Sequence, residues 1–259
     1  MTTQEATERR SPFDLNGRCA VVTGAGRGLG QAIARGLARA GADLVLLGRP
    51  GSQSSTRDQV ADLGRDVEIV DLDVSDHEAV EQVAAEVNSN RQVDILINNA
   101  GIIDRADSVD VSRQSWNRVV DINLTGLFLL CQAFGRPMAE RGHGKIVNIA
   151  SLLSFQGGIR VASYAASKHG VAGITKALAN EWGPRGLQIN AIAPGYIATD
   201  NTTALRADPD RSRSILERIP AGRWGDASDI AGAAVFLSSA AADYVNGHVL
   251  VVDGGWLAR

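Results

Sequence analysis

Residues 18–30 read Arg-Cys-Ala-Val-Val-Thr-Gly-Ala-Gly-Arg-Gly-Leu-Gly, and this stretch decides the fold. The apolar run that ends at Thr23 predicts a short strand, and the spaced glycines after it predict a tight turn. Leu29, Ile33 and Leu37 then recur at helical spacing. A strand, a glycine turn and a helix in this order let the backbone approach a pyrophosphate at the positive end of the helix.

The same alternation continues along the rest of the chain. Strands are predicted at 18–23, 43–48, 66–71, 93–98, 145–150, 187–193 and 248–252. The first helix is predicted to stop at Gly41, and further helices are predicted at 54–63, 76–87, 113–141, 164–182 and 228–238. The pattern predicts the α/β class, as a single doubly wound Rossmann-type domain with a mostly parallel seven-stranded sheet flanked by helices.

The chain divides into a short leader and one domain. Residues 1–13 are polar and lack the apolar core of a secretory signal, so we expect a disordered leader on a cytoplasmic protein. Residues 14–259 are predicted to form the Rossmann domain. Within it, the polar segment 196–225 is predicted to be a mobile lid, with a plain surface insertion as the alternative.

The composition argues against several classes of function. Lys and Arg number 26 against 29 Asp and Glu, and the net charge of −3 argues against nucleic-acid or membrane-surface binding. No apolar run approaches the roughly 18 residues that would suggest a membrane span. Cys19 and Cys131 lack metal-ligand spacing, so we expect reduced core cysteines and no metal site.

Charges near the glycine turn bear on the choice of dinucleotide. Folds that prefer NAD often place an acid at the end of the second strand, whereas an arginine there accommodates the 2′-phosphate of NADP. Here that strand ends in Gly48 and Arg49, and Arg27 lies within the glycine turn. Local charge therefore favours NADP, with solvent-facing arginines as the alternative.

Polar residues also follow two other predicted strands. Asp73-Val74 comes after the strand 66–71, and the run Asn98-Asn-Ala-Gly101 ends the strand 93–98. Ligands of open parallel sheets bind beyond the carboxyl ends of the strands, so the first pair could meet an adenine edge and the second run could hold a ribose. Alternatively, these side chains only form turns by bonding to nearby backbone.

The chemistry is predicted to lie between Ser151 and Lys168. Tyr164 and Lys168 are four residues apart on a predicted helix, so their side chains share one face. A tyrosine pKa is about 10 when unperturbed, and a neighbouring ammonium lowers it toward the range useful for proton transfer with an alcohol. Ser151, at a predicted strand end, could aim its hydroxyl at the same oxygen. Taken alone, the Tyr-Lys pattern is more often an ordinary exposed helical pair.

Asn123 lies within the predicted helix 113–141 in an apolar context. An unpaired buried amide is destabilising, so this side chain needs a partner. Two interpretations remain open, a structural hydrogen bond and a part in a proton relay.

Together these motifs resemble the short-chain dehydrogenase/reductase family from about Gly17 to Arg259. The resemblance rests on residues 23–30, the run 98–101, Asn123, Ser151, Tyr164 with Lys168, and Pro194-Gly195 with Thr199. It implies that Tyr164 is the general acid/base and that Ser151 holds the reacting oxygen. It also implies that Lys168 lowers the pKa of Tyr164 and binds the nicotinamide ribose, while Asn123 anchors a water relay.

With the local charges, the resemblance implies a larger set of cofactor-binding residues: Gly24, Arg27, Gly28, Leu29, Gly30, Arg49, Asp73, Val74, Asn99, Ala100, Gly101, Tyr164, Lys168, Pro194, Gly195, Ile197 and Thr199.

The tracts 154–161, 218–225 and 253–259 further resemble a subgroup of this family that acts on sugar acids. The resemblance implies hydride transfer between NAD(P) and a secondary alcohol or ketone of a sugar acid such as 2-dehydro-3-deoxy-D-gluconate or 2-deoxy-D-gluconate. Ser151 and Tyr164 would face this substrate, and Arg105 or Arg160 could clamp its carboxylate unless they are merely solvated. The subgroup tends to use NAD, so the cofactor is predicted only as NAD or NADP.

Two other functions stay open. One is reduction of another ketone, such as a 3-oxoacyl thioester; the other is a non-catalytic dinucleotide sensor or scaffold, against which the complete Ser, Tyr, Lys and Asn set argues. Beyond a small-molecule substrate, the expected partners are copies of the chain, because the family usually forms tetramers or dimers. We expect a homotetramer.

Overall fold

The computed structural model describes residues 11–259, so most of the predicted leader, residues 1–10, lies outside the described residues. Seven strands form one sheet in the order β3-β2-β1-β4-β5-β6-β7. All neighbouring strands pair in parallel. The predicted α/β fold with a seven-stranded sheet is therefore confirmed. The strands are β1 (Cys19–Thr23), β2 (Asp43–Gly48), β3 (Val67–Asp71), β4 (Ile95–Asn98), β5 (Gly144–Ile149), β6 (Leu187–Pro194) and β7 (Val249–Val252).

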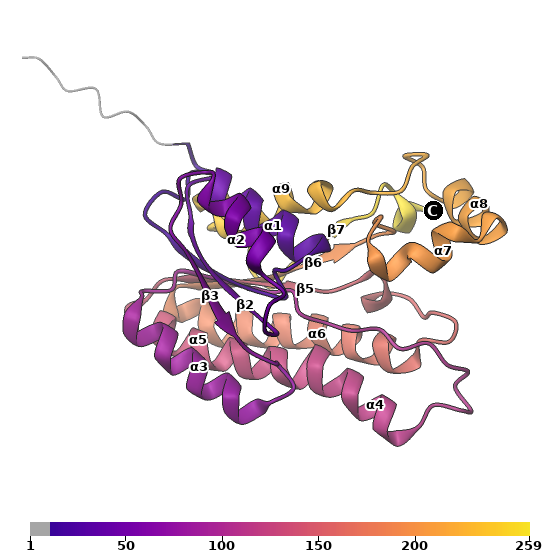
Figure 1. Cartoon of the computed structure of the whole chain (residues 1–259), viewed down its shortest axis with the longest axis horizontal. Coiled ribbons are helices and arrows are strands. Elements are labelled where there is room, and N and C mark those ends of the chain that lie inside the picture. Colours follow the sequence, from indigo (N-terminus) through magenta and orange to yellow (C-terminus); the bar gives the residue numbers. More distant parts are fainter. Residues whose placement is uncertain (1–10) are drawn as a thin grey trace, which may run out of the picture.

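Helices cover both faces of the sheet. In Figure 1, α3, α4, α5 and α6 lie below the sheet, whereas α1, α2 and α9 lie above it. The helices are α1 (Gly28–Arg39), α2 (Ser54–Ala61), α3 (His77–Asn90), α4 (Arg113–Val120), α5 (Leu127–Arg141), α6 (Ala162–Trp182), α7 (Thr203–Ala207), α8 (Pro209–Arg218) and α9 (Ala227–Ser238). Short helical turns are η1 (Asp121–Gly126), η2 (Leu152–Ser154), η3 (Gly183–Arg185), η4 (Asp200–Thr202), η5 (Ala240–Ala242) and η6 (Trp256–Ala258).

The central strands are largely apolar because both of their faces are buried. Along β2, Val45 and Leu47 point into the core shared with α3, α5 and α6. Leu44 and Leu46, between them, point into the core shared with α1 and α9. Each such side chain contributes about 1.5–3 kcal/mol when fully buried, so the alternation holds helices on both sides of the sheet.

The strand order reverses next to β1, which pairs with β2 on one side and β4 on the other. The chain runs outward from β1 to β3 and then returns to place β4 against the free edge of β1. In open parallel sheets such a switch point leaves a crevice beyond the carboxyl ends of the two central strands. The glycine turn follows β1, and Asn99 follows β4, so both predicted binding segments meet at this crevice.

The predicted helix 113–141 is interrupted in the structure. Residues 121–126 form the π-helical turn η1 between α4 and α5. A Cβ on Gly126 would collide with the Val74 carbonyl oxygen, so this turn packs directly on the loop after β3. The predicted helical stretch is therefore present, but its α-helical geometry is not continuous, because the spacing of apolar residues does not register one extra residue in a helical turn.

The segment predicted as a lid contains η4, α7 and α8. Figure 1 shows α7 and α8 beside the C-terminal end of the chain, at the carboxyl edge of the sheet. Ile215 and Ile219, at the end of this segment, pack on Trp256 and on Leu152. The segment is therefore anchored near η2, the turn that follows β5.

Within residues 11–259, no helix is long and apolar enough to cross a membrane. The same residues contain no group of three or more His, Cys, Asp or Glu side chains placed to hold a metal ion.

Candidate functional site

A pocket of about 420 Å³ lies at the switch point of the sheet. Its walls come from the glycine turn, the carboxyl ends of β2 and β4, the loop after β3, the start of α6 and the turn η4. Fourteen of the predicted cofactor-binding residues line it: Gly24, Arg27, Gly28, Leu29, Gly30, Arg49, Asp73, Val74, Asn99, Ala100, Gly101, Tyr164, Lys168 and Thr199. One cavity thus brings together segments that are far apart in the sequence.

Three predicted cofactor residues do not line this pocket. Pro194 ends β6 and is buried, and a Cβ on Gly195 would approach the Asp253 Cα to 2.6 Å. Ile197 is 5% exposed and packs in the core beside α1 and α9. These residues fix the path of the chain that carries Thr199 to the pocket, and their predicted direct contact was not found in the lining.

The glycine turn has a shape that only glycine allows at two points. Gly24 and Gly28 have φ angles of 63° and 54°, which are costly for other residues. A Cβ on Gly30 would lie 2.5 Å from the Asn99 Nδ2 atom and would also collide with the Gly24 carbonyl oxygen. The turn therefore lies directly against the end of β4, and it leads into the first turn of α1, where free N–H groups favour an anion.

Thr23 fixes this turn, although the sequence analysis assigned it no site role. Its Oγ1 accepts hydrogen bonds from the Asn99 backbone N–H at 3.0 Å and from the Ala100 N–H at 2.9 Å. The Asn99 Nδ2 in turn donates to the carbonyl oxygens of Thr23 and Gly24, at 2.9 and 3.1 Å. The two switch-point segments are thus joined by side chains, and a threonine directly before the first glycine was the available signal.

The outer end of the pocket is charged. The Arg27 guanidinium pairs with the Asp200 carboxylate at 2.9 Å, and both side chains are mostly exposed. Asp73 accepts hydrogen bonds from the Ser75 hydroxyl and backbone, which lower its pKa, and the charges of Arg49 and Arg118 act in the same direction against burial. This end therefore presents guanidinium groups from three segments of the chain.

The end of β2 has no room for an acid in this conformation. A Cβ on Gly48 would collide with the side-chain amide of Gln53, which is fully buried behind it. Gln53 accepts a hydrogen bond from the Ser52 hydroxyl at 2.6 Å, and Ser52 lines the pocket. The packing of Gln53 against position 48 favours glycine there, and no local pattern in the sequence indicates this contact.

Lys168 lies one helical turn after Tyr164 on α6, as the spacing predicts. Its ammonium is buried and donates a hydrogen bond to the Ile149 carbonyl oxygen at 2.6 Å. It lies 5.6 Å from the centre of the Tyr164 ring. Burial lowers the pKa of Lys168 to about 8. Lys168 is therefore buried and Tyr164 partly buried, so the pair is not an exposed helical one.

The Tyr164 phenol is held beside Ser151. Burial raises the pKa of Tyr164, and the hydrogen bond with the Ser151 side chain and the charge of Arg105 lower it by less. Desolvation of the phenolate therefore outweighs both effects, so the net pKa lies above its ordinary value; that Lys168 lowers the pKa of Tyr164 stays a prediction. Ser151 also accepts a hydrogen bond from the Leu153 N–H at 3.2 Å, which orients its hydroxyl group.

Asn123 lies in the π-helical turn η1 with its amide fully paired. Its Oδ1 accepts from the Ile102 N–H and its Nδ2 donates to the Ile102 carbonyl oxygen, both at 2.8 Å. The Nδ2 also donates to the Ser167 hydroxyl at 3.2 Å, and Ser167 donates to the Tyr164 carbonyl oxygen at 2.8 Å. Of the two interpretations, the structure contains the structural bond, which ties the loop after β4 to the helix that carries Tyr164.

The two arginines predicted to clamp a substrate differ in their surroundings. Arg160 pairs with Asp107 at 3.2 Å and has a left-handed φ of 64°, which is uncommon outside glycine. Its carbonyl oxygen accepts a hydrogen bond from the Ala106 N–H at 3.1 Å, so it joins two loops. Arg105 lies close enough for its charge to act on Tyr164. Arg160 is thus engaged by Asp107, and the role of either arginine at the substrate stays a prediction.

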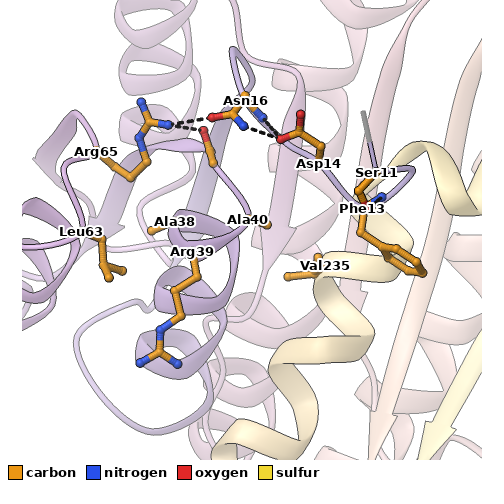
Figure 2. A pocket seen from close by; sticks show the side chains of 11 residues that line it. Ser11, Phe13, Asp14, Asn16, Ala38, Arg39, Ala40, Leu63, Arg65 and Val235 are labelled. Carbon is orange, nitrogen blue, oxygen red and sulfur yellow. Dashed lines mark hydrogen bonds between the residues drawn. The ribbon is translucent and has the colours of Figure 1, made fainter. Parts of the chain in front are cut away.

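A larger hollow of about 590 Å³ lies elsewhere and contains none of the predicted site residues. Figure 2 shows its side chains, which come from the segment 11–16, the end of α1 and the loop after α2. Arg65 donates to the Asn16 Oδ1 and to the Gly41 carbonyl oxygen at 3.1 and 2.9 Å. The polar groups of this hollow thus stabilise the chain around it, and its chemistry differs from that of the switch-point pocket.

Comparison with known proteins identifies the family to which this site belongs. A family model described as enoyl-(acyl carrier protein) reductase matches residues 24–257. A 2-dehydro-3-deoxy-D-gluconate 5-dehydrogenase of Bacillus subtilis is 57% identical over 247 residues, which cover 95% of this chain and 97% of that protein. The chain belongs to the short-chain dehydrogenase/reductase family.

Solved structures of short-chain dehydrogenases share the fold over nearly the whole chain. A proposed 2-deoxy-D-gluconate 3-dehydrogenase of Agrobacterium tumefaciens with bound NADP is 58% identical, with a TM-score of 0.92, and the match covers 96% of this chain and 100% of that one. A gluconate 5-dehydrogenase of Burkholderia cenocepacia in complex with NADP and tartrate is 41% identical, with a TM-score of 0.93 and coverages of 96% and 98%.

As a short-chain dehydrogenase/reductase, the protein is an NAD(P)-dependent oxidoreductase that acts on CH–OH groups. Its pocket fits this cofactor. The glycine turn lets a pyrophosphate approach the N-terminus of α1, and Arg27 and Arg49 supply positive charge at the outer end. Tyr164 and Lys168 lie in the lining of the same pocket.

Proposed function

We propose that this protein oxidises a secondary hydroxyl of a sugar acid, or reduces the corresponding ketone, with an NAD(P) cofactor. The observation that carries the proposal is the convergence of Ser151, Tyr164 and Lys168 beside the dinucleotide pocket. The relatives named for 2-dehydro-3-deoxy-D-gluconate and gluconate support the substrate class. A free sugar acid such as 2-dehydro-3-deoxy-D-gluconate or 2-deoxy-D-gluconate fits this chemistry.

In the proposed mechanism, Tyr164 transfers the proton and Ser151 holds the substrate oxygen. The nicotinamide, when bound, accepts or returns the hydride. During oxidation the Tyr164 phenolate takes the proton from the substrate hydroxyl, while the Ser151 hydroxyl donates a hydrogen bond to the same oxygen. Lys168 contributes its positive charge beside the phenol and holds the nicotinamide ribose. Asn123 anchors the chain that would lead protons from Lys168 to solvent.

The proposal includes a preference for NADP. Arg27 and Arg49 would meet the 2′-phosphate, and Asp73, Val74 and Asn99 would surround the adenosine. The buried Gln53 amide lies where a side chain at position 48 would begin, so an acid there, the residue type that would favour the free ribose hydroxyl of NAD, would have to displace it. The NADP-bound relatives support this preference.

The proposal further assigns Arg105 to the substrate and residues 196–225 to a lid. The charge of Arg105 acts on both Tyr164 and Tyr196, so a carboxylate between them would find a partner. The lid segment starts at the end of β6 and returns to the C-terminal turn η6, and its helices pack on Leu152 next to Ser151. Closure would exclude water from the reacting oxygen.

We also include a cytoplasmic homotetramer in the proposal. Trp116 on α4 and Phe128 on α5 are large apolar side chains that are 40% and 37% exposed, which suits a contact between copies. Cys19 and Cys131 are free, and burial raises the pKa of both thiols, so neither is poised for oxidation. Light scattering of the purified protein would test the assembly; a monomer would refute it.

One assay tests the function. The near-ultraviolet absorbance of the reduced nicotinamide is followed while the purified protein meets 2-dehydro-3-deoxy-D-gluconate, 2-deoxy-D-gluconate, D-gluconate or a 3-oxoacyl thioester, with NAD and NADP in parallel. Turnover of a sugar acid supports the proposal. Turnover of the thioester alone, or of no substrate while the cofactor binds, would replace it with the reductase or the non-catalytic interpretation.

A further inference from the structure

One face of the lid helix α8 is turned toward the catalytic residues. Arg211, Ile215 and Arg218 are spaced by four and three residues, so they lie along one side of this helix. Ile215 is 4% exposed and packs in a cluster with Leu152 and Trp256. Because Ile215 lies between the two arginines, both of them flank this contact.

The contact lies next to the reacting oxygen. Leu152 directly follows Ser151, whose side chain hydrogen-bonds with the Tyr164 phenol. The cluster that contains Ile215 therefore joins α8 to the residue that neighbours the catalytic serine. A side chain one turn before Ile215, such as Arg211, projects from the same face of α8.

The two arginines of this face differ in their contacts within the protein. The Arg218 guanidinium stacks on the Trp256 ring, 4.0 Å from its centre, and is thus engaged by the C-terminal turn. Arg211 is exposed, and within residues 11–259 its guanidinium forms no ion pair. The acids beside Arg211 are occupied, because Asp208 caps α8 and Asp210 lies 3.8 Å from Arg213. Arg211 is therefore available for an anion from outside the chain.

Tyr196 and Arg218 both pack on the ring of Trp256. The Tyr196 ring packs on Trp256 at 4.6 Å and edge-on to Trp224 at 5.6 Å. Burial raises the pKa of Tyr196, and the charges of Arg211, Arg218 and Arg105 lower it. Arg105 also acts on Tyr164, so it links this cationic region to the proton-transfer residue.

We propose that Arg211 on α8 joins Arg105 in binding the carboxylate of the sugar-acid substrate, at the end of the molecule away from the hydroxyl held by Ser151 and Tyr164. The inference rests on the proposed function. In 2-dehydro-3-deoxy-D-gluconate the carboxylate and the reacting hydroxyl are several bonds apart, so they need binding groups from separate segments. Arg211 supplies one of these binding groups from the lid. Because the substrate then bridges Arg211 and Ser151, its binding favours the arrangement in which α8 lies close to Ser151.

The test compares Arg211→Gln with Arg213→Gln. Both substitutions remove one exposed positive charge from α8, but Arg213 lies on another side of the helix and is near Asp210. KM and kcat are measured for 2-dehydro-3-deoxy-D-gluconate and D-gluconate, and the Kd of NADP is measured by titration. We expect Arg211→Gln to raise KM about 10- to 100-fold with a smaller change in kcat, because one charge-assisted hydrogen bond is lost. Arg213→Gln and the Kd of NADP should stay within about twofold of wild type.

Two results would overturn the inference. Equal KM values for the two variants would show that Arg211 is not a carboxylate partner, as would an effect of Arg211→Gln confined to NADP binding. In either case the wild-type enzyme still oxidises sugar acids, and the proposed function stands. If the wild-type enzyme turns over no sugar acid, the proposed function fails first, and the inference fails with it.

Discussion

The side chain of Lys168 is buried, and burial disfavours its charged form. Its pKa falls from 10.5 to about 8, so between these values the folded protein binds fewer protons at this residue than the unfolded chain does. The free energy of unfolding therefore rises with pH across this window. The stability gained when Lys168 becomes neutral is fully lost below about pH 8, where the residue is charged in both states. Burial of the Lys168 ammonium lowers the stability of the fold, and the same ammonium lies beside Tyr164, where the proposed mechanism needs a positive charge.

The substitution Lys168→Met should remove this pH dependence. Urea unfolding is measured from pH 7 to pH 10.5 for both proteins. The wild type should gain on the order of 3 kcal/mol relative to the variant across this range, since each pKa unit corresponds to about 1.4 kcal/mol. Unfolding curves that change in parallel for the two proteins would show that burial does not disfavour the charge.

The substitution Tyr164→Phe should lower kcat/KM by about 10²- to 10⁴-fold, because the proton-transfer group is removed. The dissociation constant of NADP and the melting temperature should change little. Tyr244→Phe is the matched control, since Tyr244 is fully exposed and far from the pocket lining. Activity of Tyr164→Phe equal to that of the control would contradict the assignment.

At the residue scale, spacing in the sequence predicted some placements and missed others. The four-residue step from Tyr164 to Lys168 predicted a shared helical face, and both residues line one pocket. The net pKa of Tyr164 was not predictable, because it depends on how much water the folded chain excludes. Nor was the place of Arg160, whose left-handed backbone and bond to Asp107 depend on the meeting of two loops.

Among the elements, the glycine turn has the least tolerance for change. Gly30→Ala places a Cβ 2.5 Å from the Asn99 Nδ2 atom. We expect the free energy of unfolding to fall by about 1–3 kcal/mol and NADP binding to weaken at least tenfold. The measurements are urea unfolding and titration calorimetry.

Gly173→Ala is the control for this prediction. Gly173 lies in α6, and a Cβ there would meet nothing within 4 Å. An alanine inside a helix is favoured over glycine by about 0.5–1 kcal/mol, so this variant should be as stable as wild type or more so. A loss of stability in both variants alike would argue against a specific collision at Gly30.

At the element scale, the spacing of apolar residues predicted which segments form helices and strands. It did not predict where the regular geometry of a helix changes. The predicted helix 113–141 contains the π-helical turn at residues 121–126. This turn depends on the bonds of Asn123 to Ile102 and on the approach of Gly126 to Val74, which come from other parts of the chain. Contacts between distant segments leave no period in the local sequence.

At the scale of the whole molecule, cofactor binding should appear as a change in melting temperature. A ligand at a hundred times its Kd adds about 2.7 kcal/mol, which for a chain of this size corresponds to roughly 5–10 °C. We expect NADP to raise the melting temperature more than NAD at equal concentration, and Arg49→Gln to reduce the NADP shift to the NAD value.

Arg57→Gln is the matched control for Arg49→Gln. Arg57 is exposed on α2 and pairs with Asp58 at 2.7 Å, outside the pocket lining. The control should keep the full NADP shift. A larger shift with NAD than with NADP in the wild type would refute the proposed preference.

For the molecule as a whole, the class of fold could be predicted from the sequence. Buried parallel strands appear as short apolar runs, and the helices that cover them appear as apolar residues at helical spacing. Residues 23–30, 98–101 and 151–168 were predicted to meet, and they do so around one pocket. The cationic face of α8 was not predicted. It depends on Trp256, in the turn η6, packing on a helix some forty residues earlier in the chain, at Arg218.

The strand order also has a consequence for synthesis on the ribosome. Strand β1 is made early, but its second partner, β4, is made much later: Cys19 and Asp94, which are hydrogen-bonded beside this pairing, are 75 residues apart. A nascent chain that ends before β4 therefore carries an apolar strand with one unpaired edge, which is an aggregation hazard. Refolding from denaturant should be slow for the same reason and should lose yield as protein concentration rises, so chaperones that shield strand edges would matter most during the first hundred residues of translation.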